Sequence, residues 1–182
     1  MALGKWKKLS ESVLFKNPWW TYKKDETEYP GGRRGEYHYV STNGASMVLP
    51  VLDDGRIVLV NQYRYLNERE SWEFPCGGVK DGHTYEQTAR QELEEEAGYV
   101  AEEWRMAGFF NPYNGVTNEI CRVFVAQKLR SVPPKPDESE EFEMTALQPD
   151  EINAWIASGR IWDGMTIASW TIGRPALVAV NR

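Results

Sequence analysis

Short apolar segments separated by turn residues occupy much of the chain, and they predict a series of β-strands. Asp53-Asp54-Gly55 lies between two of these segments and predicts the turn of a hairpin. A second turn is expected at Pro30-Gly31-Gly32. The expected strands cover residues 12–15, 19–25, 36–41, 45–52, 56–63, 71–74, 104–110, 119–127 and 140–146.

A helical period replaces this pattern between residues 85 and 97. The apolar stripe of this helix consists of Ala89, Leu93 and Ala97. Thr84 offers an N-cap, with a glutamine three residues later as its capping-box partner, and Gly98 offers a stop. Two further helices are expected at 149–159, which begins with proline and ends with glycine, and at 164–179.

This order of strands and helices favours an α/β (α+β) fold, in which a mixed β-sheet is sandwiched between α-helices. Residues 1–35 differ from the rest because they are polar and spotted with aromatic side chains. We therefore expect an N-terminal β-strand extension over residues 1–35 and one domain over residues 36–182, which is an ordinary size for a single domain.

Composition and charge narrow the classes of function. The formal net charge of -6 argues against binding to nucleic acid, which needs a basic surface. Two cysteines and two histidines are too few for a disulfide framework or a Cys/His zinc site. The N-terminus lacks the apolar stretch of a signal peptide, and no apolar run approaches the roughly 20 residues of a membrane span. We expect a cytoplasmic protein that does not bind membranes.

The segment QELEEEAGY, residues 91–99, crowds carboxylates onto the end of the helix predicted at 85–97. Residues three and four apart share a helix face, so Glu92, Glu95 and Glu96 are neighbours, whereas Glu94 points elsewhere. Their mutual repulsion and the negative helix end are both unfavourable. A divalent cation with oxygen ligands would reverse this effect, and Mg²⁺ commonly takes one or two carboxylates plus substrate phosphate. The alternative is a solvated acidic face.

A glycine-punctuated loop, PCGGVKDGH at 75–83, leads into this helix and favours the metal interpretation, because glycines let a backbone approach a ligand closely. Loop and helix together resemble the box of the Nudix hydrolases. That box begins here at Gly77 and continues at matching spacings through Glu92, Leu93, Glu95, Glu96, Gly98 and Tyr99. The resemblance implies a Nudix fold and Mg²⁺ (or Mn²⁺) bound by Glu92, Glu95, Glu96 and the carbonyl of Gly77.

Two positions depart from the box. His83 stands where the family has a glutamate, and Gln91 stands where it has an arginine. Both changes remove a charge, so the two side chains are expected to form a neutral, hydrogen-bonded replacement for an ion pair. The departures also leave a second function open. In this alternative, the protein is a non-catalytic or weakly active Nudix-like module that binds a nucleotide and regulates a partner.

The segments that flank the box resemble the ADP-ribose pyrophosphatase-like branch of the family. This resemblance implies hydrolysis of a nucleoside diphosphate sugar, such as ADP-ribose, to a nucleoside monophosphate and a phosphorylated product. It also implies that Glu119 lies by the metal ions or the attacking water. The catalytic candidates are therefore Glu95, Glu96 and Glu119.

Two residues outside the box are candidates for binding the substrate. The planar guanidinium of Arg64 suits a diphosphate, although Arg64 is equally a surface residue of a strand. Trp20 could stack on a nucleotide base, whereas a place in the core or at a dimer contact is the commoner role of such a residue. In the branch resembled here, the N-terminal extension joins two subunits, so we expect a C₂ homodimer with a small nucleotide substrate.

Overall fold

The computed structural model describes residues 3–133 and 141–178, which fall into two compact units. The N-terminal unit comprises Met1–Asn43 and Asn111–Glu119, and the larger unit comprises Gly44–Phe110 and Ile120–Arg182. Residue 35, the expected end of the extension, falls inside a strand of the N-terminal unit. That strand is Arg34–Ser41, and the expected boundary between extension and domain stays a prediction.

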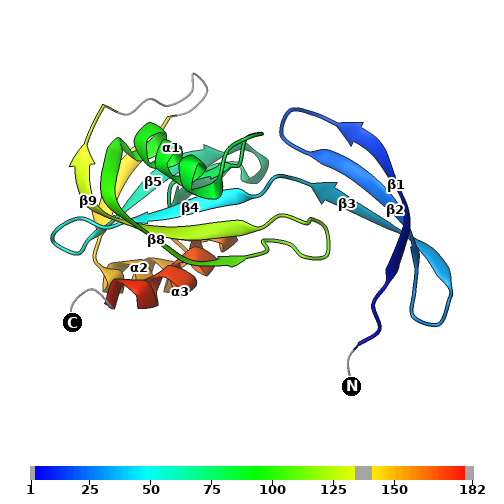
Figure 1. The fold of residues 1–182 in the computed structure, drawn as a ribbon. Helices are drawn as coiled ribbons and strands as arrows, with labels where there is room; N and C mark the ends of the chain where they lie inside the picture. Colours follow the sequence, from blue (N-terminus) through cyan, green and yellow to red (C-terminus); the bar gives the residue numbers. More distant parts are fainter. Residues whose placement is uncertain (1–2, 134–140, 179–182) are drawn as a thin grey trace. The chain divides into compact units, whose positions relative to one another are not determined.

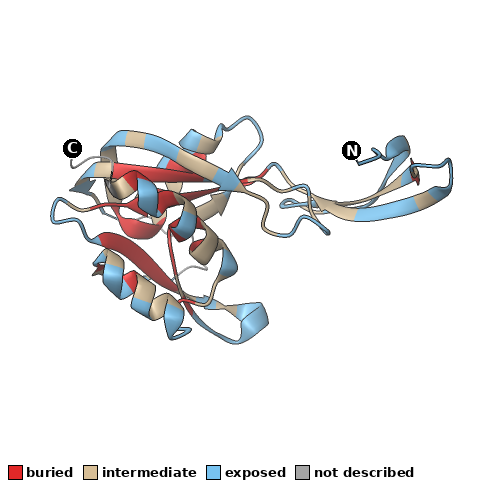
Figure 2. Ribbon diagram, turned by 90° about the horizontal axis from the view of Figure 1, so that it is seen from below, coloured by how far each residue is buried: buried red, intermediate tan, exposed pale blue. Residues whose placement is uncertain are grey.

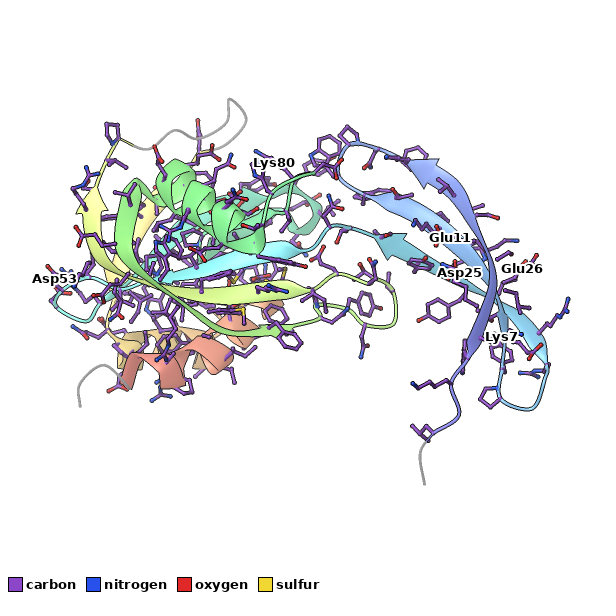
Figure 3. All side chains as sticks on the ribbon, viewed as in Figure 1. Lys7, Glu11, Asp25, Glu26, Asp53 and Lys80 are labelled. Carbon is purple, nitrogen blue, oxygen red and sulfur yellow. The ribbon has the colours of Figure 1, made fainter. Side chains whose placement is uncertain are left out.

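The N-terminal unit is built on an antiparallel sheet in the order β1-β2-β3. Its strands are β1 (Lys7–Lys16), β2 (Thr21–Glu28) and β3 (Arg34–Ser41). β1 begins well before the expected 12–15 because charged side chains pair across it and β2. The Lys8 ammonium lies 3.2 Å from the carboxylate of Asp25, and Lys23 lies 2.9 Å from Glu11. Hydrogen bonds from Lys8 and Lys23 lower the pKa of Glu11 to about 2; Glu11 and Asp25 are labelled in Figure 3.

The larger unit contains two sheets. One is mixed, in the order β7-β4-β9-β8, with β4 and β9 parallel, and the other is antiparallel, in the order β10-β5-β6. The strands of the mixed sheet are β4 (Ala45–Pro50), β7 (Cys76–Gly78), β8 (Tyr99–Phe110) and β9 (Cys121–Ser131). Those of the second sheet are β5 (Ile57–Arg64), β6 (Arg69–Glu73) and β10 (Glu143–Leu147).

Helices cover both sides of these sheets of the larger unit, as Figure 1 shows. Helix α1 (Tyr85–Ala97) lies on one side, and α2 (Pro149–Ala157) and α3 (Gly164–Val178) lie on the other. The mixed sheet between helices that the sequence predicts is confirmed. Within the described ranges, each helix is too short or too polar to span a lipid bilayer.

The core of this unit has two parts because its central strands bury both faces. Along β4, Val48 packs with Leu93 on the α1 side, and Leu49 packs with Ile152 and Trp170 on the side of α2 and α3. Figure 2 shows the buried strands between less buried helices. All six residues of β4 are buried, as expected for a strand paired on both edges and covered on both faces.

Most expected elements are present, with small differences at their ends. The strand expected at 140–146 is observed as Glu143–Leu147, and residue 140 lies outside the described residues. The loop expected at 75–83 is wrong in part, because Cys76–Gly78 pairs with β4 as strand β7. Three residues with two glycines carry no alternating pattern, so only their partner strand reveals them. 

The hairpin expected at Asp53-Asp54-Gly55 is present as a tight turn, in which Gly55 has a φ of 82°. Beyond the turn the two strands separate, since β4 and β5 belong to different sheets and are joined only by a bridge between Val51 and Ile57. The turn was therefore predicted correctly, and the pairing of the two whole strands was wrong. Each strand instead exchanges hydrogen bonds with other partners in its own sheet.

Helix α1 has the bounds that the sequence predicts, and its caps explain why. The hydroxyl of Thr84 accepts a hydrogen bond from the Gln87 backbone N–H at 3.2 Å, and the Gln87 side chain accepts one from Thr84 N–H at 2.8 Å. Gly98 ends the helix in the left-handed conformation, with a φ of 63°. Both caps confirm the sequence prediction.

We expect Thr84→Ala to lower the free energy of unfolding by about 1 kcal/mol, because α1 loses the side-chain half of its capping box. Thr84→Ser keeps the hydroxyl and should stay close to the parent protein. Urea unfolding followed by circular dichroism measures both variants. Equal destabilisation by alanine and serine would show that the cap contributes nothing.

Candidate active site

The backbone of β7 lies against the carboxylate of Glu92. A Cβ atom built on Gly77 would lie 2.0 Å from Oε1 of Glu92 and 2.2 Å from its Cδ. Both distances are too short for atoms that are not bonded to each other. Glycine at position 77 therefore permits the contact between strand and carboxylate. The neighbouring Gly78 differs, since a Cβ there would meet nothing within 4 Å.

Glu96 is the most enclosed of the helix carboxylates, with 6% of its surface exposed. Its Oε2 accepts a hydrogen bond of 3.0 Å from the backbone N–H of Cys76. A charge-assisted bond of this kind offsets part of the cost of burying a carboxylate. Glu92 and Glu96 thus approach two consecutive residues of β7, Gly77 and Cys76. Three positions of the expected box, Gly77, Glu92 and Glu96, therefore lie close together.

The Cys76 thiol lies among these groups. Contact with the Cys121 thiol and burial raise the pKa of Cys76 well above its usual value, and the carboxylates of Glu96 and Glu92 raise it further. A thiol with a raised pKa is a poor nucleophile at neutral pH. These contacts fit Cys76 as a small packing residue between β7 and its neighbours.

Glu95 receives a hydrogen bond from the helix itself. The side-chain amide of Gln91 donates to Oε1 of Glu95 at 2.9 Å, one turn further along α1. The structure directs the N–H side of the Gln91 amide along the helix toward Glu95, and the expected hydrogen bond between His83 and Gln91 stays a prediction. An arginine at position 91 could reach back to a carboxylate in the loop, but the shorter neutral side chain finds its acceptor at i+4.

Arg64 forms an ion pair with Glu73 on the neighbouring strand. Its Nε donates to Oε1 of Glu73 at 2.8 Å, and its Nη2 donates to Oε2. The hydrogen bonds to Glu73 raise the pKa of Arg64, and smaller contributions come from Asp163 and Cys76, which lie nearby. Glu73 is the last residue of β6, and only two residues separate it from β7, the strand that contacts Glu92 and Glu96.

The oxygen donors of α1 fit a hard divalent cation in their chemistry. Among residues 3–133 and 141–178, no three His, Cys, Asp or Glu side chains are already gathered as a metal cage. Mg²⁺ does not need such a cage, because it usually keeps water and binds through one or two carboxylates together with substrate phosphates. The residues therefore suit a cation that arrives with the substrate.

Two expected site residues belong to the N-terminal unit. Glu119 accepts a hydrogen bond of 3.0 Å from the hydroxyl of Thr42. Trp20 has 38% of its surface exposed and packs its ring 5.6 Å from that of Phe15. These contacts hold both side chains within their own unit.

Sequence reasoning missed two residues with charge near α1. Glu73 is buried and engages both donors of Arg64, a role that depends on how β5 and β6 are paired. Arg122 places its guanidinium 4.2 Å from the ring centre of Tyr85, the first residue of α1. The alternation of β9 could have placed Arg122 on the face opposite Cys121, but it could not have shown the contact with Tyr85.

Fold and site define a class of protein, an α/β domain whose glycine-containing strand contacts a helix rich in carboxylates. Residues 42–165 match the family model described as the NUDIX domain. The chain therefore belongs to the Nudix family.

Several known proteins are similar to this chain in sequence or in structure. The chain is 33% identical over 144 residues to an ADP-ribose pyrophosphatase of Bacillus subtilis (strain 168), which is 78% of each chain. It is 32% identical over 145 residues to a methanol dehydrogenase activator of Bacillus methanolicus, covering 79% of this chain and 78% of that one. A crystal structure of an ADP compounds hydrolase has the same fold, with a TM-score of 0.86, 21% identity and coverage of 100% of this chain and 99% of that one.

We expect Gly77→Ala to weaken Mn²⁺ binding by about 10- to 100-fold, the size of effect seen when ligand orientation is disturbed. The new methyl group would displace the Glu92 carboxylate, which is a flexible side-chain end, so the fold should survive. Gly78→Ala is the matched control, because open space surrounds that position. Calorimetric titration with Mn²⁺ compares the two, and equal affinities would show that the Glu92 carboxylate has no part in binding the metal.

Proposed function

We propose that this protein hydrolyses a nucleoside diphosphate sugar, such as ADP-ribose, to a nucleoside monophosphate and a phosphorylated sugar. Membership of the Nudix family and the similarity to a protein named ADP-ribose pyrophosphatase support this activity. The observation that carries it is the contact of Glu92 and Glu96 with Gly77 and Cys76. This contact concentrates oxygen ligands at one point of a glycine-containing strand.

Mg²⁺ or Mn²⁺ is the proposed cofactor, held by Glu92, Glu95, Glu96 and the carbonyl oxygen of Gly77. When bound, the cation would offset the charge of the diphosphate and make a water molecule more acidic. The bond from Cys76 N–H holds Glu96 in one orientation, and the Gln91 amide does the same for Glu95. Their fixed carboxylates spare the substrate complex the cost of ordering flexible side chains.

The remaining roles are assigned to Arg64 and to the carboxylates that can accept a proton. Arg64 donates two of its five N–H groups to Glu73 and keeps the others for diphosphate oxygens. Glu95, Glu96 and Glu119 are the candidates for accepting the proton of the attacking water, which would join one phosphorus atom as the bridging oxygen leaves.

A second candidate function is regulation by nucleotide binding with little or no hydrolysis. Two observations favour it. The box departs from the family pattern at His83 and Gln91, and one relative is named an activator of methanol dehydrogenase. The two functions differ in one measurable respect, the release of nucleoside monophosphate.

The test is a panel of nucleoside diphosphate sugars and dinucleotides incubated with Mg²⁺, followed by identification of the products. We expect ADP-ribose to give a nucleoside monophosphate, and Glu96→Gln to lower turnover at least about 100-fold, since loss of outer-shell partners alone can reach that size. Glu94→Gln, on another face of α1, is the matched control. Tight nucleotide binding without any product would instead support the regulatory function.

The proposal includes a C₂ homodimer formed through the N-terminal unit. This unit exposes apolar side chains that a monomer would leave in water. They include Val13 and Phe15 of β1 and Trp19 of the turn between β1 and β2, with 58%, 54% and 79% of their surfaces exposed. In the dimer, Trp20 of one subunit would contact the base in the site of the other.

We expect the double variant Val13→Glu with Phe15→Glu to be monomeric at micromolar concentration and to bind nucleotide more weakly. Charge on this apolar surface would oppose its burial against a second copy. Met106→Glu, at a similarly exposed apolar position of β8, is the control and should leave the assembly unchanged. Light scattering gives the mass, and a parent protein that is already monomeric would refute the dimer.

A further inference from the structure

The ion pair between Arg64 and Glu73 has an unusual geometry for two adjacent strands. Arg64 stands opposite Arg69 at the end of the β5–β6 pair, whereas Glu73 stands opposite Val60, four residues back along β5. The Arg64 side chain therefore lies back along the sheet to reach Glu73. Val60 belongs to the core cluster that contains Leu93 of α1, so the pair lies on the α1 side of the sheet.

The two partners are exposed to very different degrees. Glu73 has 1% of its surface exposed, and the side chain of Arg64 has 43% exposed. Both carboxylate oxygens of Glu73 accept hydrogen bonds from one edge of the guanidinium. A buried carboxylate that engages one edge leaves the other edge of the guanidinium, with three N–H groups, toward the exposed side.

Stability alone is a weak reason for such a pair. Desolvation of two charges often cancels their attraction, and a packed apolar pair of the same volume would serve the fold as well. The pair has a clearer use in orientation, because arginine has many rotamers and a bidentate carboxylate selects one of them. The neighbouring Asp163 is not a substitute, since its Oδ2 accepts a bond of 2.7 Å from Thr166 N–H at the start of α3.

We propose that Glu73 is a positioning residue for the substrate diphosphate: it fixes the Arg64 guanidinium with its free edge beside the strand that carries Cys76 and Gly77. This inference rests on the proposed function and assigns a role to a residue that does not itself touch the substrate. Glu73 removes the rotational freedom of Arg64 before the substrate binds, so less freedom is lost on binding. A neutral residue at position 73 would leave Arg64 charged and present but poorly oriented.

The first experiment is a double-mutant cycle on ADP-ribose turnover with Mg²⁺, using Glu73→Gln, Arg64→Ala and the double variant. Glutamine keeps the volume but offers one acceptor and turns N–H groups toward the guanidinium. We expect Glu73→Gln to raise KM about tenfold or more, as loss of a charged hydrogen bond suggests, with a smaller change in kcat. The double variant should be no worse than Arg64→Ala alone, because Glu73 acts through Arg64.

Glu70→Gln is the matched control, with the same change on the same strand. The Glu70 carboxylate accepts a hydrogen bond of 3.1 Å from Asn61 and makes none to Arg64. Its KM should stay within about twofold of the parent value, as is usual for exposed substitutions away from special features. Additive effects of Glu73→Gln and Arg64→Ala, or an unchanged KM in folded Glu73→Gln, would overturn the inference.

A second experiment separates orientation from a general loss of structure. Added guanidinium ion at low, non-denaturing concentration should restore activity to Arg64→Ala, because the intact Glu73 carboxylate can hold it in the vacated place. Methylammonium cannot bond to both oxygens in parallel and should restore less. Equal recovery with the two cations would overturn the inference even if Glu73→Gln fails to fold.

Failure of the proposed function has a different signature. In that case the parent protein releases no nucleoside monophosphate, and the same variants are compared by calorimetric titration with ADP. Weaker ADP binding by both Glu73→Gln and Arg64→Ala, without further loss in the double variant, would still support positioning. Unchanged ADP affinity in both single variants would overturn it.

Discussion

The contact between helix α1 and strand β7 is the constraint on which the rest of the site depends. Small and apolar residues draw α1 onto the sheets, since Ala89 and Leu93 are fully buried and Ala97 is nearly so. At 3.6 residues per turn, the positions beside this stripe are Glu92 and Glu96, which must therefore approach the sheet as well. Burial of carboxylates is costly unless donors or cations meet them. A backbone N–H and a residue without a side chain are what β7 supplies at this point.

Helix α1 has few cationic side chains to balance its carboxylates. The helix carries one cationic side chain, Arg90, and that guanidinium is occupied by Glu86 at 2.7 Å and lies over the ring of Trp104. The exchange of the family's arginine for Gln91 removes a second positive charge, and the amide can only donate a neutral hydrogen bond to Glu95. The last turns of α1 thus carry four carboxylates and no cationic side chain. Loss of the box arginine leaves Glu92, Glu95 and Glu96 in place, and Gln91 contacts one of them, Glu95, through a neutral hydrogen bond.

Features of the fold and site that depend on residues near one another in the sequence could be predicted, whereas features that depend on distant residues could not. Helix α1 was predicted to the residue because its stripe, its capping box and its terminal glycine are all local. Strand β7 and the pair of Arg64 with Glu73 were missed because they depend on which strands become neighbours, and sequence patterns carry little of that information. The contact between Gly77 and Glu92 could be predicted only in part. Its glycine was recognised from the sequence, but the reason for it is a steric contact visible only in three dimensions.

The N-terminal unit poses the opposite problem, because many of its apolar side chains are exposed. Within its described residues the elements are strands, and the exposed apolar side chains of β1 contribute little to the stability of this sheet. The ion pairs of Lys8, Lys23 and Glu11 lie at the surface, where water and salt screen such pairs and leave them little net stabilising effect. Aromatic contacts such as that of Trp6 with Tyr29, at 4.4 Å between ring centres, add a further small amount. Burial of the exposed side chains of β1 against another apolar surface would stabilise this unit more than these surface contacts do.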